Sequence, residues 1–395
     1  MLRYRIFYIL TLTATVLFYL FFTGYLSFFM MAAAILLPFV SWALTFFGVR
    51  KTSIRIEPES PYANKDEEFL LYIVLKNASI VPIAQAGLKF CCENSLCGEK
   101  RNEALFLSVG SGPEQAAEYR MKSQYCGKIT VELTRVKYYD YLGIFTIVQK
   151  PKLYTEIFVA PKPCFLDAQI DTAANPDMES NTYSKEKPGS DPSEIFDIRP
   201  FRSGDRLRSI HWKLSSKLDE LMVKEFSLPT DSSVLLLVEL MAADMAALDT
   251  VVEALASLSR FLTENQIHHC VEWYDKEHDR FEQNLIENDE DLAVLLNAVL
   301  SARQYRDEPC ALACRSRLDG IVKKYPHVIY VTGRLTDTLT AFCDGRTDGE
   351  KTTVLYCGKM DSGQQKQADT LNTLKIDVIE IPSGKIQESL SGLMI

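Results

Sequence analysis

The chain begins with two runs that contain no charged residue, IFYILTLTATVLFYLFFT (residues 6–23) and YLSFFMMAAAILLPFVSWALTFFGV (residues 25–49). A bilayer core of roughly 30 Å requires roughly 20 helical residues, so each run is long enough to span it. Only Gly24 and its neighbours remain to turn the chain between the runs. We therefore expect residues 1–50 to form a transmembrane anchor of two helices, arranged as a hairpin.

Positive residues flank both outer ends of this hairpin. Arg3 and Arg5 precede the first run, and Arg50, Lys51 and Arg55 follow the second. Lys and Arg gather at the cytoplasmic ends of membrane spans, so both ends of the hairpin are expected in the cytoplasm. The chain is thus predicted to be a multi-pass protein of the cell membrane with both termini cytoplasmic.

The N-terminal runs have two alternative interpretations. A signal peptide requires a small-x-small cleavage site, and none precedes the second run. A single re-entrant segment, interrupted at Pro38, is the other alternative. It is less favoured because prolines are tolerated inside membrane spans.

The composition is that of a globular chain. Of the 395 residues, 47% are hydrophobic and 24% are charged, and the formal net charge is −9. This length suits two or three domains beside an anchor. The acidic balance argues against a nucleic-acid binder with a wholly basic surface, so no nucleic-acid partner is predicted, although a local basic patch is compatible with it.

The cysteines indicate a reducing compartment. None of the ten forms a CxxC pair, as a zinc site would favour, and they do not follow the spacing of a disulfide framework. Cys91, Cys92 and Cys97 form the closest group, but no histidine lies near them. We expect reduced, unpaired thiols.

Residues 51–163 are predicted to form an all-β sandwich domain, because short runs rich in Val, Ile, Tyr and Phe alternate with turn residues. In one run Ile129, Val131 and Leu133 alternate with polar residues, as in a half-buried sheet. The expected strands are Ser53–Glu57, Glu68–Lys76, Ala86–Cys92, Tyr119–Lys122, Lys128–Tyr138 and Ile144–Lys150. Residues 164–193, rich in Asn, Asp, Ser, Pro and Gly from Asp171 onward, are expected to be a linker.

Residues 231–395 show an α/β pattern. Val234–Leu240 is a continuous aliphatic run, typical of a strand covered on both faces. Asp249–Thr263 then repeats apolar residues at helical spacing. The alternation continues with strands at Ile267–Tyr274, Val328–Val331, Thr353–Tyr356 and Ile376–Ile381, and helices at Asp291–Ala302, Leu312–Lys324 and Leu335–Phe342. This order indicates a mostly parallel sheet with helical crossovers.

Residues 194–230 contain the stretch EIFDIRPFRSGDRLRSIHWKLSSKLDELMVKEF (residues 194–226). Asp205 suits a helix N-cap, and Leu207, Ile210 and Leu214 then fall on one helical face. Leu221–Phe226 is expected to be a strand. Seven positive residues gather here in an otherwise acidic chain: Arg199, Arg202, Arg206, Arg208, Lys213, Lys217 and Lys224.

This stretch resembles the signature of the domain of unknown function 58 family. That signature runs approximately Arg-x-Tyr-x-x-Gly-Asp-x-x-Arg-x-Ile-x-Trp-Lys-x-Ser-Ala-Arg, followed by Leu-x-Val. The departures are Phe201 in place of Tyr, and Ser216 and Lys217 in place of Ala-Arg. The matching residues are Arg199, Gly204, Asp205, Arg208, Ile210, Trp212, Lys213, Ser215, Leu221 and Val223.

The resemblance covers most of the chain. Residues Tyr139–Phe145 (YDYLGIF) look like the family's Asp-x-Leu-Gly-Leu-Phe element, and Phe158–Pro161 looks like its Val-x-Pro strand. The resemblance implies a von Willebrand factor A-like C-terminal domain. It also implies bacterial partners: a MoxR-type AAA+ ATPase and a membrane transglutaminase-like protein. No enzymatic activity is established for the family's domain.

Neither a metal site nor a catalytic site is predicted. An A-type domain that binds metal carries Asp-x-Ser-x-Ser after its first strand, because carboxylate and hydroxyl oxygens suit a hard cation. Glu239, Met241 and Ala243 stand at these positions, so no metal and no cofactor are expected. Motifs of nucleotide binding, of serine hydrolases and of zinc proteases are absent from the sequence.

The sequence thus predicts a membrane-tethered, non-enzymatic interaction or scaffold protein that acts with a MoxR-type ATPase in the assembly or activation of envelope complexes. Trp212 and Asp205 are expected to brace the join between the two soluble domains. The alternatives are an uncharacterised hydrolase or transferase that uses the basic stretch, and a metal-dependent adhesion module, which the missing hydroxyls disfavour. The candidate signature or interaction residues are Arg199, Arg202, Gly204, Asp205, Arg208, Ile210, His211, Trp212 and Lys213.

Overall fold

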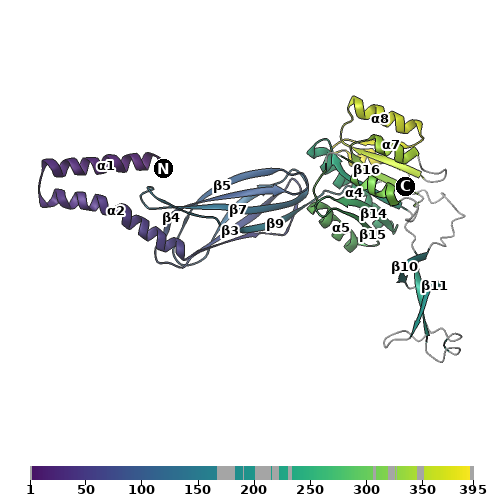
Figure 1. The fold of residues 1–395 in the computed structure, drawn as a ribbon, viewed down its shortest axis with the longest axis horizontal. Helices are drawn as coiled ribbons and strands as arrows, with labels where there is room; N and C mark the ends of the chain where they lie inside the picture. Colours follow the sequence, from purple (N-terminus) through teal and green to yellow (C-terminus); the bar gives the residue numbers. More distant parts are fainter. Residues whose placement is uncertain are drawn as a thin grey trace.

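A computed structural model describes residues 2–166, 183–189, 191–200, 215, 222–229, 234–305, 308–318, 325, 327–344 and 351–391. Figure 1 shows an elongated molecule with a pair of helices at one end. A region of strands, the β region (residues 52–160), lies in the middle, and a mixed region, the α/β region (residues 234–391), lies at the other end. Two apolar helices followed by a sheet-rich body fit the predicted order of the chain.

The two N-terminal helices are α1 (Leu2–Phe21) and α2 (Tyr25–Arg50). Both are long and apolar enough to cross a membrane. They lie side by side (Figure 1), and the Tyr8 hydroxyl donates a hydrogen bond of 3.1 Å to the carbonyl of Ala34. Helix α2 continues through Pro38 without a break.

The helices present their apolar side chains outward. Almost no side chain of α1 is buried. Exposing apolar surface to water costs roughly 25 cal/mol per Å², so such helices are unfavourable in water and favourable in lipid. A few residues of α2 are buried, most of them in its second half, where Gly48 and Val49 pack against the β region: Ser27, Pro38, Ser41, Thr45, Gly48 and Val49. These findings support association with a membrane.

Two sheets share one hydrophobic core in the β region. The first pairs β1 (Thr52–Pro58), β3 (Glu68–Asn77) and β6 (Gln115–Lys122). The second runs in the order β2 (Tyr62–Asn64), β9 (Leu153–Ala160), β7 (Gly127–Tyr139), β4 (Ile83–Asn94) and β5 (Lys100–Val109), and β8 (Thr146–Gln149) pairs with β7. Leu71 and Ile73 of the first sheet and Val131 and Leu133 of the second are fully buried in this core.

The burial of β7 agrees with the predicted alternation. Ile129, Val131 and Leu133 face the core. The pairing register then shifts between Lys89 and Phe90 of β4, and beyond this shift residues of β7 again face the core. Three strands were not predicted: β2, β5 and the first part of β9. Strand β5 begins with charged residues because it is an edge strand whose outer face is exposed, and charge is favoured at such edges.

The α/β region is built on one six-stranded sheet. Its order is β15 (Arg280–Ile286), β14 (His269–Asp275), β13 (Val234–Ala242), β16 (His327–Gly333), β17 (Lys351–Cys357) and β18 (Asp377–Ile381). All neighbours pair in parallel except β15, which is antiparallel and was not predicted. Every residue of β13 is buried, as its aliphatic run predicts.

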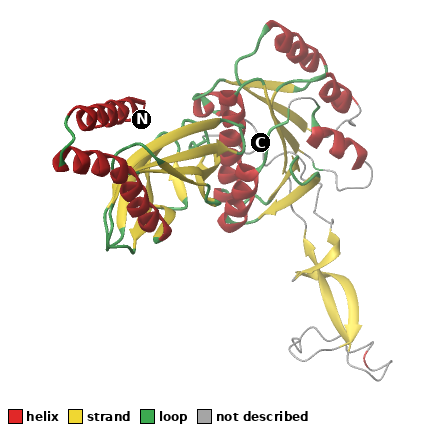
Figure 2. Ribbon diagram, turned by 60° about the vertical axis from the view of Figure 1, so that its left-hand side comes forward, coloured by secondary structure: helices red, strands yellow, loops and turns green. Residues whose placement is uncertain are grey.

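Helices cover both faces of this sheet (Figure 2). One face packs against α4 (Met245–Glu264), α5 (Asp289–Ser301) and α9 (Ile386–Leu390). The other packs against α6 (Cys310–Leu318), α7 (Asp337–Asp344) and α8 (Ser362–Thr373). Helix α8 was not predicted, because it is largely polar and buries only Ala368 and Leu371.

A three-stranded antiparallel sheet projects from the α/β region (Figures 1 and 2). It contains β10 (Tyr183–Gly189), β11 (Asp191–Pro200) and β12 (Met222–Pro229), in the order β10-β12-β11. Strand β12 agrees with the strand expected at Leu221–Phe226. Strand β10 lies within residues 164–193, which were expected to be a linker; it pairs with β12 through the backbone, without a run of large aliphatic residues.

Candidate functional site

The structure describes only part of the signature stretch. Arg199 lies on β11, directly opposite Val223 of β12. Ser215 is buried, and its Oγ accepts a hydrogen bond of 2.9 Å from the amide of Met222. Three residues that match the family signature thus meet along β12. The other candidates, Arg202, Gly204, Asp205, Arg208, Ile210, His211, Trp212 and Lys213, lie outside the described residues.

Glu239 lies near the carboxyl end of β13. Its side chain is fully buried. The carboxylate accepts hydrogen bonds from the backbone amides of Ala311 and Leu312, each at 3.1 Å, and from the hydroxyls of Tyr330, at 3.2 Å, and Tyr305. Burial raises the pKa of Glu239 to about 7, although these four donors act in the opposite direction.

The carboxylate of Glu239 therefore holds the first turn of α6, where backbone amides have no partner within the helix. Both of its oxygens are used in this way. A cation at this carboxylate would have to displace donors that fix α6 to the sheet. Among the residues that the structure describes, no group of three or more His, Cys, Asp or Glu is arranged to hold a metal ion.

Buried charges join the β region to the α/β region. The Lys65 ammonium, on the turn after β2, donates to the carboxylates of Asp249 and Glu253 on α4, the latter at 2.8 Å. Asp249 also accepts a hydrogen bond of 2.7 Å from the amide of Cys126. Further along α4, the Ser257 hydroxyl accepts one of 3.0 Å from the amide of Cys164. These contacts fix α4 against the end of the β region.

The brace expected at Trp212 and Asp205 lies outside the described residues, and the junction at Lys65 was not predicted from the sequence. A usable signal was present, because Asp249 and Glu253 lie four residues apart and therefore on one face of a helix whose other positions are mostly apolar. Two acids on an otherwise buried helix imply a partner cation. The identity of that cation, Lys65, could not be read from the sequence because it lies 184 residues away.

The Tyr139–Phe145 element forms a turn at the opposite end of the β region, against both N-terminal helices. Asp140 is buried, and its carboxylate accepts hydrogen bonds of 2.9 Å from the Ser41 hydroxyl of α2 and from the amide of Phe145. Gly143 has a φ of +67°, and a Cβ there would lie 3.3 Å from the ring of Tyr4. Glycine thus allows α1 to approach the turn closely.

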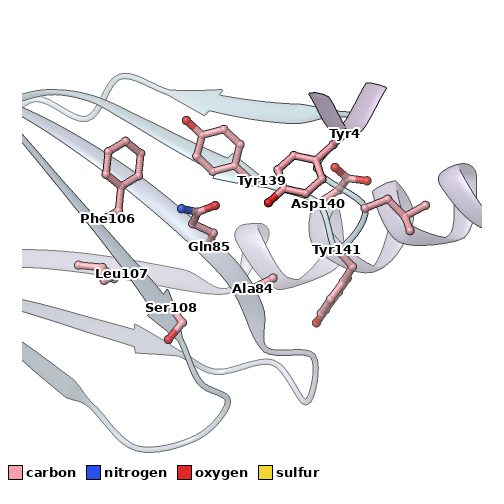
Figure 3. A pocket seen from close by; sticks show the side chains of 11 residues that line it. Tyr4, Ala84, Gln85, Phe106, Leu107, Ser108, Tyr139, Asp140 and Tyr141 are labelled. Carbon is pink, nitrogen blue, oxygen red and sulfur yellow. The ribbon is translucent and has the colours of Figure 1, made fainter. Parts of the chain in front are cut away.

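A pocket of about 770 Å³ opens beside this turn (Figure 3). Its size lies within the usual range for small-ligand sites. The described residues that line it come from α1, β4, β5, β7 and the turn: Tyr4, Ala84, Gln85, Phe106, Leu107, Ser108, Tyr139, Asp140, Tyr141, Leu142 and Gly143. The family-like element of the sequence therefore forms one wall of a pocket next to the apolar helices, which makes this pocket the candidate functional site.

Comparisons with known proteins agree with the resemblance. The family described as "Protein of unknown function DUF58" matches residues 197–266, a range that includes all nine candidate signature residues. The chain is 22% identical over 357 residues to the "Uncharacterized protein YeaD" of Bacillus subtilis (strain 168). The match covers 89% of this chain and 87% of that protein. Together these matches support the DUF58 family.

Similar solved structures cover only a part of the chain. The CARDB domain of a Pyrococcus furiosus protein, determined with two metal ions, has 8% identity and a TM-score of 0.20, covering 28% of this chain and 87% of that one. A cohesin module from Clostridium perfringens has 10% identity and a TM-score of 0.21, covering 28% of this chain and 99% of that one. Likeness at this level carries no argument about function.

Proposed function

We propose that this protein is a membrane-tethered interaction protein without enzymatic activity, which acts with a MoxR-type AAA+ ATPase in the assembly or activation of envelope complexes. The observation that carries the proposal is the fixed connection from the apolar helices to the α/β region. Ser41 and Asp140 join α2 to one end of the β region, and Lys65, Asp249 and Glu253 join α4 to the other. A rigid connection of this kind suits a protein that presents a binding surface at a set position.

The proposal includes a domain assignment. The β region would be a sandwich domain, and the α/β region would be a von Willebrand factor A-like domain that works without metal. The shared core of the two sheets supports the first assignment, and the mostly parallel sheet with helices on both faces supports the second. The use of Glu239 to hold α6 supports a metal-free domain.

The proposal also includes the topology of the anchor. The two helices would cross the membrane as a hairpin with both termini in the cytoplasm. Arg3 and Arg5 at one end and Arg50 and Lys51 at the other support this orientation. The Arg5 guanidinium also donates a hydrogen bond of 3.0 Å to the carbonyl of Ile144, so the start of α1 lies on the same side as the β region.

Labelling of introduced cysteines should test this topology. Native Cys126 and Cys357 are fully buried and would make poor reporters. Thr23→Cys, in the exposed turn between the helices, should gain labelling by an impermeant maleimide added to intact cells, relative to the wild type. Ser111→Cys, exposed on the β region, should gain labelling only after lysis. The reverse pattern would overturn the orientation.

Partner capture from membranes should test the interaction itself. The full chain is expected to retain a MoxR-type ATPase in a pull-down analysed by mass spectrometry, and to retain it in EDTA. Because exposed charges are screened over about 8 Å at physiological ionic strength, retention should weaken as salt is added. Charge reversal at Arg202 and Arg206 should reduce retention at least fivefold, since both belong to the basic stretch.

The matched control reverses Lys89 and Arg135, an exposed cross-strand pair on β4 and β7. It makes the same change in net charge outside the signature. Equal loss of the ATPase in both variants would mean that net charge, rather than the signature, attracts the partner. Retention that collapsed in EDTA and returned with Mg²⁺ would replace the metal-free reading with the adhesion-module alternative.

A further inference from the structure

The pocket beside the Tyr139–Phe145 turn lies at the level of lipid headgroups if the helices span a membrane. From the pocket residue Tyr4, helix α1 continues to its end at Phe21. At a rise of 1.5 Å per residue this length is about 25 Å, close to the roughly 30 Å of a bilayer's hydrocarbon core. With the turn at Gly24 at the far surface, Tyr4 lies at the near surface. A role for this pocket at the membrane surface therefore rests on the proposed membrane tether.

An aromatic surface forms the floor of this pocket. The rings of Phe106 on β5 and Tyr139 on β7 lie over Gly87 of β4, where a Cβ would come within 2.9 Å of the first ring and 3.4 Å of the second. Glycine thus lets the rings lie against bare backbone. Phe106 remains 58% exposed and Tyr4 63% exposed, so ring surface is available to a ligand (Figure 3).

Uncharged polar groups stand next to these rings. The side chains of Gln85 and Ser108 line the pocket and are exposed, and the amide of Gln85 lies between Tyr139 and Phe106 in Figure 3. Asp140 supplies the one carboxylate in the described lining; it is buried and already accepts hydrogen bonds from Ser41 and Phe145. The described lining contains no Lys or Arg.

We propose that this pocket binds the uncharged sugar headgroup of a membrane glycolipid. A sugar ring has an apolar face of C–H groups that packs on an aromatic ring, and hydroxyls that pair with amide and hydroxyl groups such as those of Gln85 and Ser108. A phosphate headgroup prefers Arg or Lys, which the described lining does not supply. An amine headgroup prefers an accessible carboxylate, and that of Asp140 is covered. The volume accommodates a headgroup of one or two sugar rings.

Native mass spectrometry of the full chain, in an amine-oxide detergent that contains no sugar, tests the proposal. The probes are diglucosyl diacylglycerol, phosphatidylglycerol and phosphatidylethanolamine with matched acyl chains. The wild type is expected to retain the glycolipid at concentrations at least tenfold lower than either phospholipid. Phe106→Ala and Gln85→Ala should each weaken glycolipid retention about tenfold, and Gly87→Val, which displaces both rings, should abolish it.

Tyr154→Ala is the matched control, because Tyr154 is a 68% exposed aromatic residue on β9, outside the pocket lining. It should leave retention unchanged. Equal retention of all three lipids would overturn the proposal and make the aromatic residues a general anchor in the bilayer surface. No change in Gln85→Ala, whose exposed side chain is not needed for folding, would also overturn it. If the helices do not tether the protein in a membrane, the cysteine labelling described above gives the unexpected pattern, whatever the lipid experiment shows. The failure of the tether and the failure of the pocket proposal can therefore be told apart.

Discussion

Replacing Glu239 by alanine is expected to lower the melting temperature of the α/β region by about 10 °C, because a loss of about 3–5 kcal/mol shifts a region of this size by that amount. The carboxyl group is fully buried and accepts hydrogen bonds from two amides of α6 and from two tyrosine hydroxyls. Alanine would leave these donors buried without an acceptor, and would open a cavity. Thermal unfolding of the full chain in detergent, followed by circular dichroism, measures the effect.

The control for this prediction is Glu239→Gln, which keeps one acceptor oxygen and the volume of the side chain. It should lower the melting temperature much less than alanine does. If the alanine variant melted within 2 °C of the wild type, Glu239 would not hold α6, and its burial would need another explanation.

The wild type and Glu239→Gln should also differ in how their stability depends on pH. Burial raises the pKa of Glu239 from 4.5 to about 7 in the folded state. The stability that the neutral acid contributes is therefore present below about pH 4.5 and is lost as the pH rises through about 7, a change on the order of 3 kcal/mol. Glutamine cannot ionise, so Glu239→Gln should become more stable relative to the wild type between pH 4.5 and 8.

The comparison with glutamine is needed because a second group acts in the opposite direction. His269 is buried, and burial lowers its pKa to about 4. The stability that neutral His269 contributes is therefore lost as the pH falls from 6.5 to about 4. Since His269 is present in both proteins, it cancels in their difference. A constant difference in stability between pH 4.5 and 8 would contradict the assignment to Glu239.

The second large effect is expected for Lys65→Met, which removes the cation between the β region and α4. Asp249 and Glu253 are nearly fully buried, and breaking such a cluster from one side typically costs about 3–5 kcal/mol. Burial alone would lower the pKa of Lys65, but the hydrogen bonds and charges of Asp249 and Glu253 outweigh it and raise the pKa. Burial raises the pKa of Glu253 despite the bond from Lys65.

Lys128→Met serves as the control, because Lys128 forms a more exposed pair with Glu156 in the same β region, at 3.4 Å. A pair of this kind is expected to contribute less than about 1 kcal/mol. Adding Asp249→Asn and Glu253→Gln to Lys65→Met should restore much of the stability, since no unpaired charge would remain buried. Equal melting temperatures for Lys65→Met and Lys128→Met would show that the cluster does not join the two regions.

The sequence predicted those parts of the fold that depend on local pattern. The uncharged runs gave α1 and α2, and the aliphatic run at Val234–Leu240 gave the central strand β13. Strand β5 and helix α8 were missed because both lie at the surface, where few positions are buried and the apolar period is weak. In such elements pairing with a neighbour decides the structure.

The candidate site was harder to predict for a related reason. The sequence indicates the Tyr139–Phe145 element, but its neighbours in the pocket, Tyr4, Gln85 and Phe106, come from three other elements of the chain. Lys65 and Asp249 are likewise brought together only by the tertiary fold. Sequence patterns report which face of an element is buried, whereas they do not report which distant residue covers it.

The sheet of β10, β11 and β12 has a mechanical consequence. Strand β12 ends at Pro229 and β13 begins at Val234, so a pulling force applied to the projecting sheet passes directly to β13. This strand is held between β14 on one side and β16 on the other, in parallel ladders. A force along the strand loads many of these hydrogen bonds at once, in shear, so they do not open one after another. A force applied to the projecting sheet would therefore meet high resistance at β13.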